Sequence, residues 1–320
     1  MNILNPLVSL ITGCYNGEKF IERAFHSILE QTYSPIELIF VNDGSNDGSL
    51  LKAESFIEIF HRKGIELIII DQHNQGNYST SGIKQALGKY ISILDIDDYL
   101  MPESIQVRVS FLEQNETYVA VRTNGYEVYE NDLENRTRLF VVDEVEKKRE
   151  DIFEDLLFGR TNNWAGSYMV RSNILFECYP DRIVPLSRFG QNLQILMPVA
   201  YKGKVGFIDK PLMKYIRNET SLTMSHKTFE SQIKLYEGFK EIRLSILNKL
   251  NINDSQLFQA IDQLYLNFFV DISFDFQRKT EFNFYYAQLI HTTISDKIRF
   301  HILNKNIFME LLYRLLNRIH

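Results

Sequence analysis

The fold class follows from residues 8–49, VSLITGCYNGEKFIERAFHSILEQTYSPIELIFVNDGSNDGS. A β-rich run over 7–12 precedes a helical periodicity over 16–32, and a second β-rich run covers 36–43. Asn16 is the expected N-cap of the helix, which carries an apolar face. That face consists of Phe20, Ile21, Ala24, Phe25, Ile28 and Leu29. The stretch therefore predicts a strand, a helix and a second strand.

The same alternation continues along the chain. We expect a helix over 50–60, a strand over 65–70, a short helix over 79–88 and a strand over 89–95. Strands of continuous Ile, Leu and Val that alternate with helices indicate a parallel α/β sheet covered on both faces. In such sheets, ligands bind beyond the carboxyl ends of the strands.

Polar side chains follow the second and fourth of these strands. They are Asn42 and Asp43, and then Asp95, Asp97 and Asp98 in ISILDIDDYL. Carboxylates crowded at the end of a buried strand repel one another unless a cation lies among them. Their hard oxygen atoms suit Mg²⁺ or Mn²⁺. NDGSND alone would indicate an ordinary turn, but the two motifs on successive sheet ends favour a binding site.

Composition excludes several classes of protein. The 320 residues, 45% hydrophobic and 24% charged, are typical of a folded domain, and the net charge of −6 argues against general nucleic-acid binding. Cys14 and Cys178 form no disulfide framework or zinc motif. The N-terminus lacks a basic leader pattern, and no apolar run approaches the length of a membrane span. We expect a cytoplasmic protein, or one held on the inner face of the cell membrane.

Residues 8–49, followed by NQG and then GIKQALGKYISILDIDD, resemble the opening of family 2 glycosyltransferases with the GT-A fold, of the type that acts on bacterial surface glycans or glycoproteins. The resemblance is close over 7–105 and looser to about 223. It implies a catalytic GT-A domain over 1–220, which moves a sugar from a UDP-sugar to a hydroxyl of a glycan, lipid-linked saccharide or glycoprotein, with inversion. A sugar-nucleotide nucleotidyltransferase is less consistent, because no glycine-rich basic loop lies near the N-terminus.

The resemblance also assigns roles to residues. Asp43 would hydrogen-bond the uracil, Tyr15 would pack against it, and Asp95 and Asp97 would hold the ribose and a Mn²⁺ or Mg²⁺ ion. Asp98 and Trp164 would lie on the side of the transferred sugar or the acceptor, although Trp164 could equally belong to the core. The other residues expected to line the nucleotide-sugar site are Cys14, Asn16, Gly76, Lys84 and Ile96.

The sequence departs from the family pattern in three places. Asn42 stands where an acid is usual, and NYSTS replaces a longer segment that would supply a phosphate-binding arginine. Lys84 either replaces this arginine or is a solvated surface charge. Gln191 and Asn192 occupy the place of a Glu-Asp pair whose Asp is the general base. We therefore expect Asp181, in the preceding loop, to act as the base; in the alternative, Gln191 and Asn192 only orient the acceptor while water or phosphate takes the proton. The absence of an Asp at 192 also allows a non-catalytic homologue that supports an active partner.

Later segments carry two further expectations. DKPLMKYIRNETSLT resembles the family's closing loop, in which Lys214, Arg217 and Asn218 would reach the diphosphate or would be ordinary surface residues. From about 224 the periodicity is helical, which predicts a helical C-terminal domain over 221–320, packed on the first domain or used for self-association. Residues 305–320 form a basic amphipathic pattern, either for peripheral membrane contact or for docking on the protein's own domain.

Overall fold

The computed structural model describes residues 5–134, 138–162, 164–185, 187, 190–217 and 227–304. Contacts between residues divide the chain into two compact units, Met1–Glu219 and Thr220–His320, and each is described by itself.

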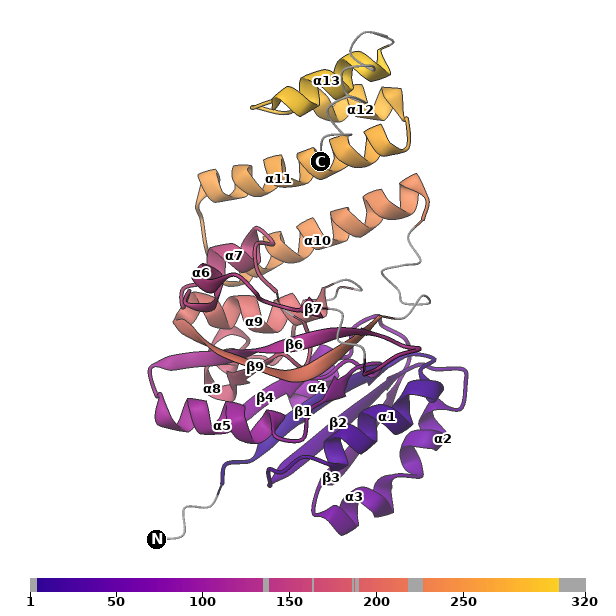
Figure 1. Ribbon diagram of the computed structural model, residues 1–320, viewed down its shortest axis with the longest axis vertical. Helices are drawn as coiled ribbons and strands as arrows, with labels where there is room; N and C mark the ends of the chain where they lie inside the picture. The colour runs from indigo at the N-terminus through magenta and orange to yellow at the C-terminus, as the bar shows by residue number, and fades with distance from the viewer. Residues whose placement is uncertain are drawn as a thin grey trace. The chain divides into compact units, whose positions relative to one another are not determined.

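The described residues of the first unit form one nine-stranded sheet in the order β3-β2-β1-β4-β8-β6-β9-β5, with β7 paired to β6 (Figure 1). The strands are β1 Val8–Cys14, β2 Ile36–Asp43, β3 Glu66–Gln72, β4 Tyr90–Ile93, β5 Tyr99–Leu100, β6 Tyr118–Tyr129, β7 Arg138–Leu139, β8 Tyr168–Arg171 and β9 Lys204–Arg217. Strands β1 to β4 run parallel. Strand β8 is antiparallel to both β4 and β6, whereas β6 and β9 are parallel to each other.

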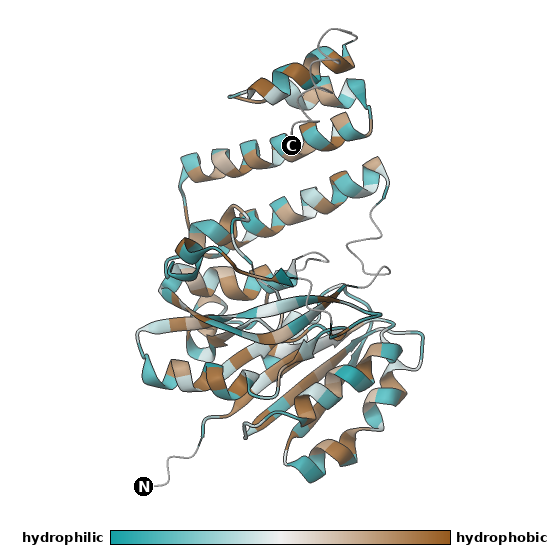
Figure 2. Ribbon diagram, viewed as in Figure 1, coloured by the Kyte–Doolittle hydropathy of each residue, from teal (hydrophilic) through white to brown (hydrophobic). Residues whose placement is uncertain are grey.

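Helices cover both faces of the sheet. One face carries α1 Glu18–Leu29, α2 Ser49–Glu54, α3 Ile57–Lys63 and α5 Ser104–Gln114. The other face carries α4 Ser79–Gln85, α8 Ser172–Cys178 and α9 Gln191–Lys202. Two further helices, α6 Glu144–Lys147 and α7 Phe153–Leu157, are short. On the first face, the ring of Phe25 makes edge contacts with Phe40, Phe56 and Phe60. The parallel strands are rich in hydrophobic residues, as Figure 2 shows, because both of their faces are covered.

The predicted α/β architecture is confirmed, with two local corrections. Gly17, not Asn16, is the N-cap of α1, because the side chain of Asn16 binds the loop after β2. The single helix expected over 50–60 is two helices, α2 and α3, which are separated at Ser55 and Phe56.

The described part of the second unit is helical, as predicted. Its helices are α10 Phe229–Lys249, α11 Ser255–Asp275, α12 Lys279–Tyr286 and α13 Ile294–Leu303. Thr228, Asp254 and Thr293 cap three of them with side-chain oxygens that accept hydrogen bonds from the first turn. The amphipathic segment over 305–320 lies outside the described residues. Within the described ranges, no helix has both the length and the apolar character needed to span a bilayer.

Candidate functional site

The loops after β1 and β2 are joined by hydrogen bonds at the carboxyl edge of the sheet. The backbone N–H of Asn16 donates to Ser45 Oγ at 2.9 Å, and the N–H of Asn46 donates to Asn16 Oδ1 at 2.7 Å. Gly17 N–H donates to Ser49 Oγ at 3.0 Å. These contacts fix the backbone on both sides of Tyr15, whose side chain is 50% exposed and can meet a ligand.

Asp43, at the end of β2, is held in place by two donors. Its Oδ1 accepts from Gln72 Nε2 at 2.7 Å and from the N–H of Gln75 at 3.0 Å. Gly44 has φ +75°, and a Cβ there would lie 2.6 Å from the backbone nitrogen of Asn74, so this close approach requires glycine. Asn42, which replaces an acid of the family pattern, donates to Asp71 Oδ1 on β3 at 2.7 Å. The asparagine at position 42 therefore joins β2 to β3 through its side chain, and Asp43 keeps its position at the end of β2.

Residues 95–98, which we call the carboxylate turn, follow β4. The N–H of Asp98 donates to the carbonyl of Asp95 at 3.1 Å and closes the turn. Burial, and then the charge of Asp97, raise the pKa of Asp95 to about 7. Burial also raises the pKa of Asp97, and raises that of Asp98 well above its ordinary range. The three groups therefore resist full ionisation unless a cation joins them.

Arg23 of α1 is a basic neighbour of this turn that the sequence analysis missed. Its Nη2 donates to the carbonyl oxygen of Asp97 at 2.7 Å, and its guanidinium forms a forked pair with Glu130 at 2.7 and 3.1 Å. Its charge favours the ionised forms of Asp97 and Asp98, against the larger effect of burial. The sequence pattern shows only a polar residue beside the apolar stripe of a helix, so it gives no signal for this contact.

The carboxylate turn fits a divalent metal of the magnesium or manganese class. Asp95 and Asp97 are partly buried and supply hard oxygen atoms. Across the described ranges, no group of three or more His, Cys, Asp or Glu side chains is arranged to hold a metal ion. A metal bound here would therefore need ligands from the bound nucleotide as well as from the protein.

Asp98 does not occupy the predicted position on the sugar or acceptor side. It is only 1% exposed, and its Oδ1 accepts from the N–H of Ile216 on β9 at 2.9 Å. Its second oxygen is buried and has no partner among the described residues. The hydrogen bond ties the end of β9 to the carboxylate turn, so Asp98 contacts the protein instead of a substrate.

The start of α9 lies at the site, as its resemblance to the family implies. Gln191 Nε2 donates to the carbonyl of Gly76 at 2.9 Å, and Gln191 Oε1 accepts from Ser79 Oγ at 3.0 Å. The side chain of Asn192 hydrogen-bonds Asp95. Because Asn192 Oδ1 is buried without a partner in the described structure, the amide nitrogen is the donor. Gln191 thus fixes the loop around Gly76, and Asn192 contacts the carboxylate turn.

Asp181 lies away from the carboxylate turn. It is exposed, and its Oδ1 accepts from the backbone N–H two residues later at 3.1 Å. The neighbouring Arg182 donates to the carbonyls of Lys84 and Ala86 at the C-terminal end of α4. Tyr78, which reaches the carboxylate turn, precedes the other end of this helix, roughly 10 Å away at 1.5 Å per residue. This placement does not support Asp181 as the base, and Lys84 is likewise an exposed residue away from the turn.

Trp164 belongs to an aromatic cluster beside the carboxylate turn. Its ring stacks on Tyr215 of β9 with centroids 5.3 Å apart and planes 10° apart, and Phe140 contacts it edge-on at 3.9 Å. Burial, and then the charges of Asp98, Asp97 and Asp95, raise the pKa of Tyr215 to about 12. The Trp164–Tyr215 stack is therefore partly core and lies close to the turn.

The side chains of Cys14 and Ile96 point into the core, so only their main-chain atoms could meet a nucleotide. They are 2% and 9% exposed and belong to the buried cluster around Phe25. The Cys14 thiol lies 3.5 Å from Ser49 Oγ, and burial raises its pKa.

The cations expected to meet the diphosphate have acidic partners. Lys214 pairs with Glu134 at 2.8 Å. Arg217 pairs with the buried Glu127, which also pairs with Arg138 at 2.7 Å. Asn218 lies outside the described residues. For Arg217 to bind a diphosphate, it would have to leave Glu127.

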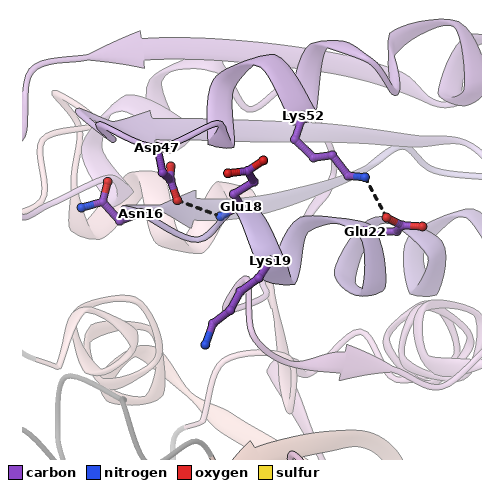
Figure 3. A pocket seen from close by; sticks show the side chains of 6 residues that line it. All are labelled: Asn16, Glu18, Lys19, Glu22, Asp47 and Lys52. Atoms are coloured by element: carbon purple, nitrogen blue, oxygen red, sulfur yellow. Dashed lines mark hydrogen bonds and ion pairs between the residues drawn. The ribbon is translucent and has the colours of Figure 1, made fainter.

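A polar pocket of about 440 Å³ lies beside the first turn of α1 (Figure 3). Its lining consists of Asn16, Glu18, Lys19, Glu22, Asp47 and Lys52. Lys52 and Glu22 form an ion pair at 2.7 Å, and Asp47 accepts from the N–H of Glu18 at 3.2 Å. Because Lys52 and Glu22 pair with each other, and the carboxylates of Asp47 and Glu18 already accept backbone N–H groups, we do not assign this pocket to the nucleotide.

Residues 9–179 match the family described as glycosyl transferase family 2. An uncharacterised glycosyltransferase of Haemophilus influenzae is 28% identical over 261 residues, which cover 78% of this chain and 76% of the relative. The uncharacterised glycosyltransferase EpsJ of Bacillus subtilis is 38% identical over 134 residues, and the match spans 41% of this chain but only 37% of EpsJ.

Two solved structures share the fold. S. aureus TarS 1–349 in complex with UDP-GlcNAc has a TM-score of 0.58 at 19% identity, with 92% of this chain and 79% of TarS covered. The mannosyltransferase PcManGT of Pyrobaculum calidifontis, in complex with GDP-Man and Mn²⁺, has a TM-score of 0.57 at 14% identity, with 99% and 81% covered. The family match includes β1, β2 and the carboxylate turn, and the chain belongs to glycosyl transferase family 2 and is a glycosyltransferase.

Proposed function

We propose that this protein transfers a sugar from a UDP-sugar to a hydroxyl group of an acceptor, with a divalent metal and with inversion at the sugar carbon. The observation that carries the proposal is the carboxylate turn at the carboxyl edge of the sheet. Asp43 ends β2, which is separated from β4 by β1, and Tyr15 is exposed directly after β1. The UDP-GlcNAc complex of TarS and the Mn²⁺ complex of PcManGT support a nucleotide-sugar donor and a metal.

Each residue at the edge has a proposed part in donor binding. Asp43 accepts a hydrogen bond from the uracil, and Tyr15 packs against the base. Asp95 holds the ribose and, with Asp97, the Mn²⁺ or Mg²⁺ ion, while Arg23 holds the turn through the carbonyl of Asp97. When bound, the metal offsets the negative charge that develops on the departing diphosphate.

The reaction breaks the bond between the sugar carbon and the phosphate oxygen, and UDP leaves with the electron pair. The acceptor hydroxyl oxygen forms the new bond on the opposite face and gives up its proton to water or to a phosphate oxygen of the departing UDP. The amide of Asn192 cannot accept that proton at ordinary pH, so we give Asn192 a role in holding Asp95. The acceptor is a hydroxyl of a glycan, a lipid-linked saccharide or a glycoprotein, and the Trp164–Tyr215 stack is its proposed platform.

The test is a panel of UDP- and GDP-sugars scored by released nucleotide, with Mn²⁺ and with EDTA. We expect release from a UDP-sugar with Mn²⁺ and loss of release in EDTA. Asp97→Asn should lower kcat by on the order of 10³-fold, because several kcal/mol of transition-state stabilisation depend on the metal. Asp71→Asn, at the end of β3, is the matched control and should stay active. Release that is insensitive to both EDTA and Asp97→Asn contradicts the metal role.

A second candidate function is a non-catalytic homologue that binds nucleotide and supports an active partner. The neutral Asn192 at the position of the family's base favours it. This function requires UDP binding in the presence of Mn²⁺ with no turnover of any sugar nucleotide. Self-association, a cytoplasmic location and membrane contact through 305–320 stay predictions of the sequence.

A further inference from the structure

Tyr78 lies in NYSTS, the segment in which this chain departs from the family pattern and lacks the expected arginine. No local sequence pattern assigns this tyrosine a role. The structure places its ring and its hydroxyl against two different parts of the site.

The ring of Tyr78 fills a space that exists because residue 13 is glycine. A Cβ on Gly13 of β1 would lie 2.1 Å from Cδ1 and 2.2 Å from Cγ of the tyrosine ring. No side chain fits there unless the ring moves. Gly13 and Tyr78 are therefore a fitted pair across β1.

The hydroxyl of Tyr78 reaches the carboxylate turn. It donates to Asp95 Oδ1 at 3.3 Å, and the second hydrogen bond to this carboxylate comes from Asn192. Both donors are neutral. The other proposed metal ligand, Asp97, instead has the guanidinium of Arg23 on its carbonyl. The two ligands are thus held by different chemistry, and Tyr78 belongs to the shell around Asp95.

The backbone on both sides of Tyr78 is anchored. Asn77 Nδ2 donates to the carbonyl of Pro185 at 3.0 Å and Asn77 Oδ1 accepts from the N–H of Ser79 at 2.9 Å, while Thr80 Oγ1 donates to the carbonyl of Val184 at 3.0 Å. Such a supporting shell limits the positions open to the tyrosine hydroxyl.

We propose that Tyr78 is a positioning residue that orients the carboxylate of Asp95 toward the metal and the ribose of the donor. This inference rests on the proposed function and adds a residue to it. Partners of metal ligands commonly change metal affinity by 10- to 100-fold when they are removed. Because the hydrogen bond is long, we expect an effect near the lower end of this range.

The test measures Mn²⁺ and UDP binding by the full chain with isothermal titration calorimetry. Tyr78→Phe keeps the ring over Gly13 and removes only the hydroxyl. We expect it to weaken UDP binding in the presence of Mn²⁺ by roughly 10-fold, with no change in the residual binding measured in EDTA. Tyr90→Phe is the matched control, because Tyr90 lies at the amino end of β4 and its hydroxyl donates to Glu113.

Thermal unfolding separates positioning from a general effect on folding. In EDTA, Tyr78→Phe should melt within about 2 °C of the wild type, as expected for a change well below 1 kcal/mol, yet Mn²⁺ with UDP should raise its Tm less than that of the wild type. Gly13→Ala, which displaces the ring, should show the same loss of metal-dependent UDP binding. Equal Mn²⁺-dependent binding by the wild type and Tyr78→Phe, or an equal loss in Tyr90→Phe, overturns this inference alone. A wild type that binds no UDP with Mn²⁺ overturns the proposed function and this inference together.

Discussion

The two halves of the sheet in the first unit are built differently. Strands β1 to β4 are parallel, short, and joined by helices along the chain, and they carry Asp43 and the carboxylate turn. On the other side, β6 and β9 have 12 and 14 residues, and three register shifts interrupt their pairing. The aromatic cluster and the Glu127 ion pairs belong to this half. The proposed donor site thus lies on β1 to β4, which are close to one another in the sequence. The proposed acceptor platform lies on the half with β6 and β9, which is formed by contacts between distant segments.

Arg108 joins the two halves and gives the largest predicted change in stability. It is fully buried on α5, and it donates to Ser92 Oγ on β4 and to the carbonyls of Gly166 and Tyr168 at 2.8–3.1 Å. Arg108→Met would leave Ser92 Oγ and the Gly166 carbonyl without this buried donor, and the Tyr168 carbonyl would keep its hydrogen bond from Ser92 Oγ. We therefore expect a loss of about 3–5 kcal/mol in the free energy of unfolding.

Urea unfolding of Arg108→Met, followed by circular dichroism, measures this loss. Arg62→Met is the matched control, because Arg62 is exposed and donates only to a carbonyl of its own helix. A destabilisation below about 1 kcal/mol, the scale of a single ordinary hydrogen bond, would show that Arg108 does not hold the halves together.

In the metal-free protein, ionisation of Asp95 in the carboxylate turn should lower the free energy of unfolding in a pH-dependent way. The pKa of Asp95 is about 7 in the folded protein and near 3.9 when unfolded. Between these values the folded state binds more protons, so the free energy of unfolding falls as pH rises, and the cost is fully present above about pH 7. Asp95→Asn removes the ionisable group and should stabilise the protein in EDTA by on the order of 2–4 kcal/mol at pH 8, with no gain near pH 4.

Thermal unfolding in EDTA at the two pH values tests this, and Mn²⁺ with UDP provides the internal control. Added ligands should raise the Tm of the wild type and leave Asp95→Asn almost unchanged. If Asp95→Asn is the less stable protein at pH 8 in EDTA, the carboxylate turn is not strained by its own charge.

The difference between the halves also explains what the sequence could predict. Strands β1 to β4 and the carboxylate turn could be predicted from the sequence, because hydrophobic periodicity, apolar runs and turn residues are local signals. The helical character of the C-terminal region, which contains α10 and α11, could be predicted for the same reason. The position of Arg23 beside Asp97, and of Tyr78 over Gly13, depends on how separate elements pack, which no local pattern records. Asn16 was wrongly expected to cap α1 because the competing partner, Asn46, lies 30 residues away.

The smallest predicted effect concerns Asp181. Its substitution tests whether the loop that carries Asp181 belongs to the active site. Sequence reasoning assigned the base to Asp181 because it precedes the start of α9 in the chain. In the structure, Asp181 accepts a hydrogen bond from the backbone of its own loop, near the C-terminal end of α4 and away from the carboxylate turn. Asn192 is the residue that contacts Asp95.

We therefore expect Asp181→Asn to keep kcat and donor KM within about twofold of the wild type, because a lost surface contact rarely exceeds about 0.5 kcal/mol. Asn192→Ala, in the same loop-to-helix region, should instead raise the donor KM in the presence of Mn²⁺, because Asp95 loses one of its two neutral donors. Steady-state kinetics of both variants over a range of donor concentrations separates the two effects. A fall in kcat of about 10²-fold for Asp181→Asn, with the donor KM unchanged, is the result expected of a general base. That result would mean that the loop carrying Asp181 reaches the reacting atoms in the working enzyme, and that Asp181 belongs to the active site.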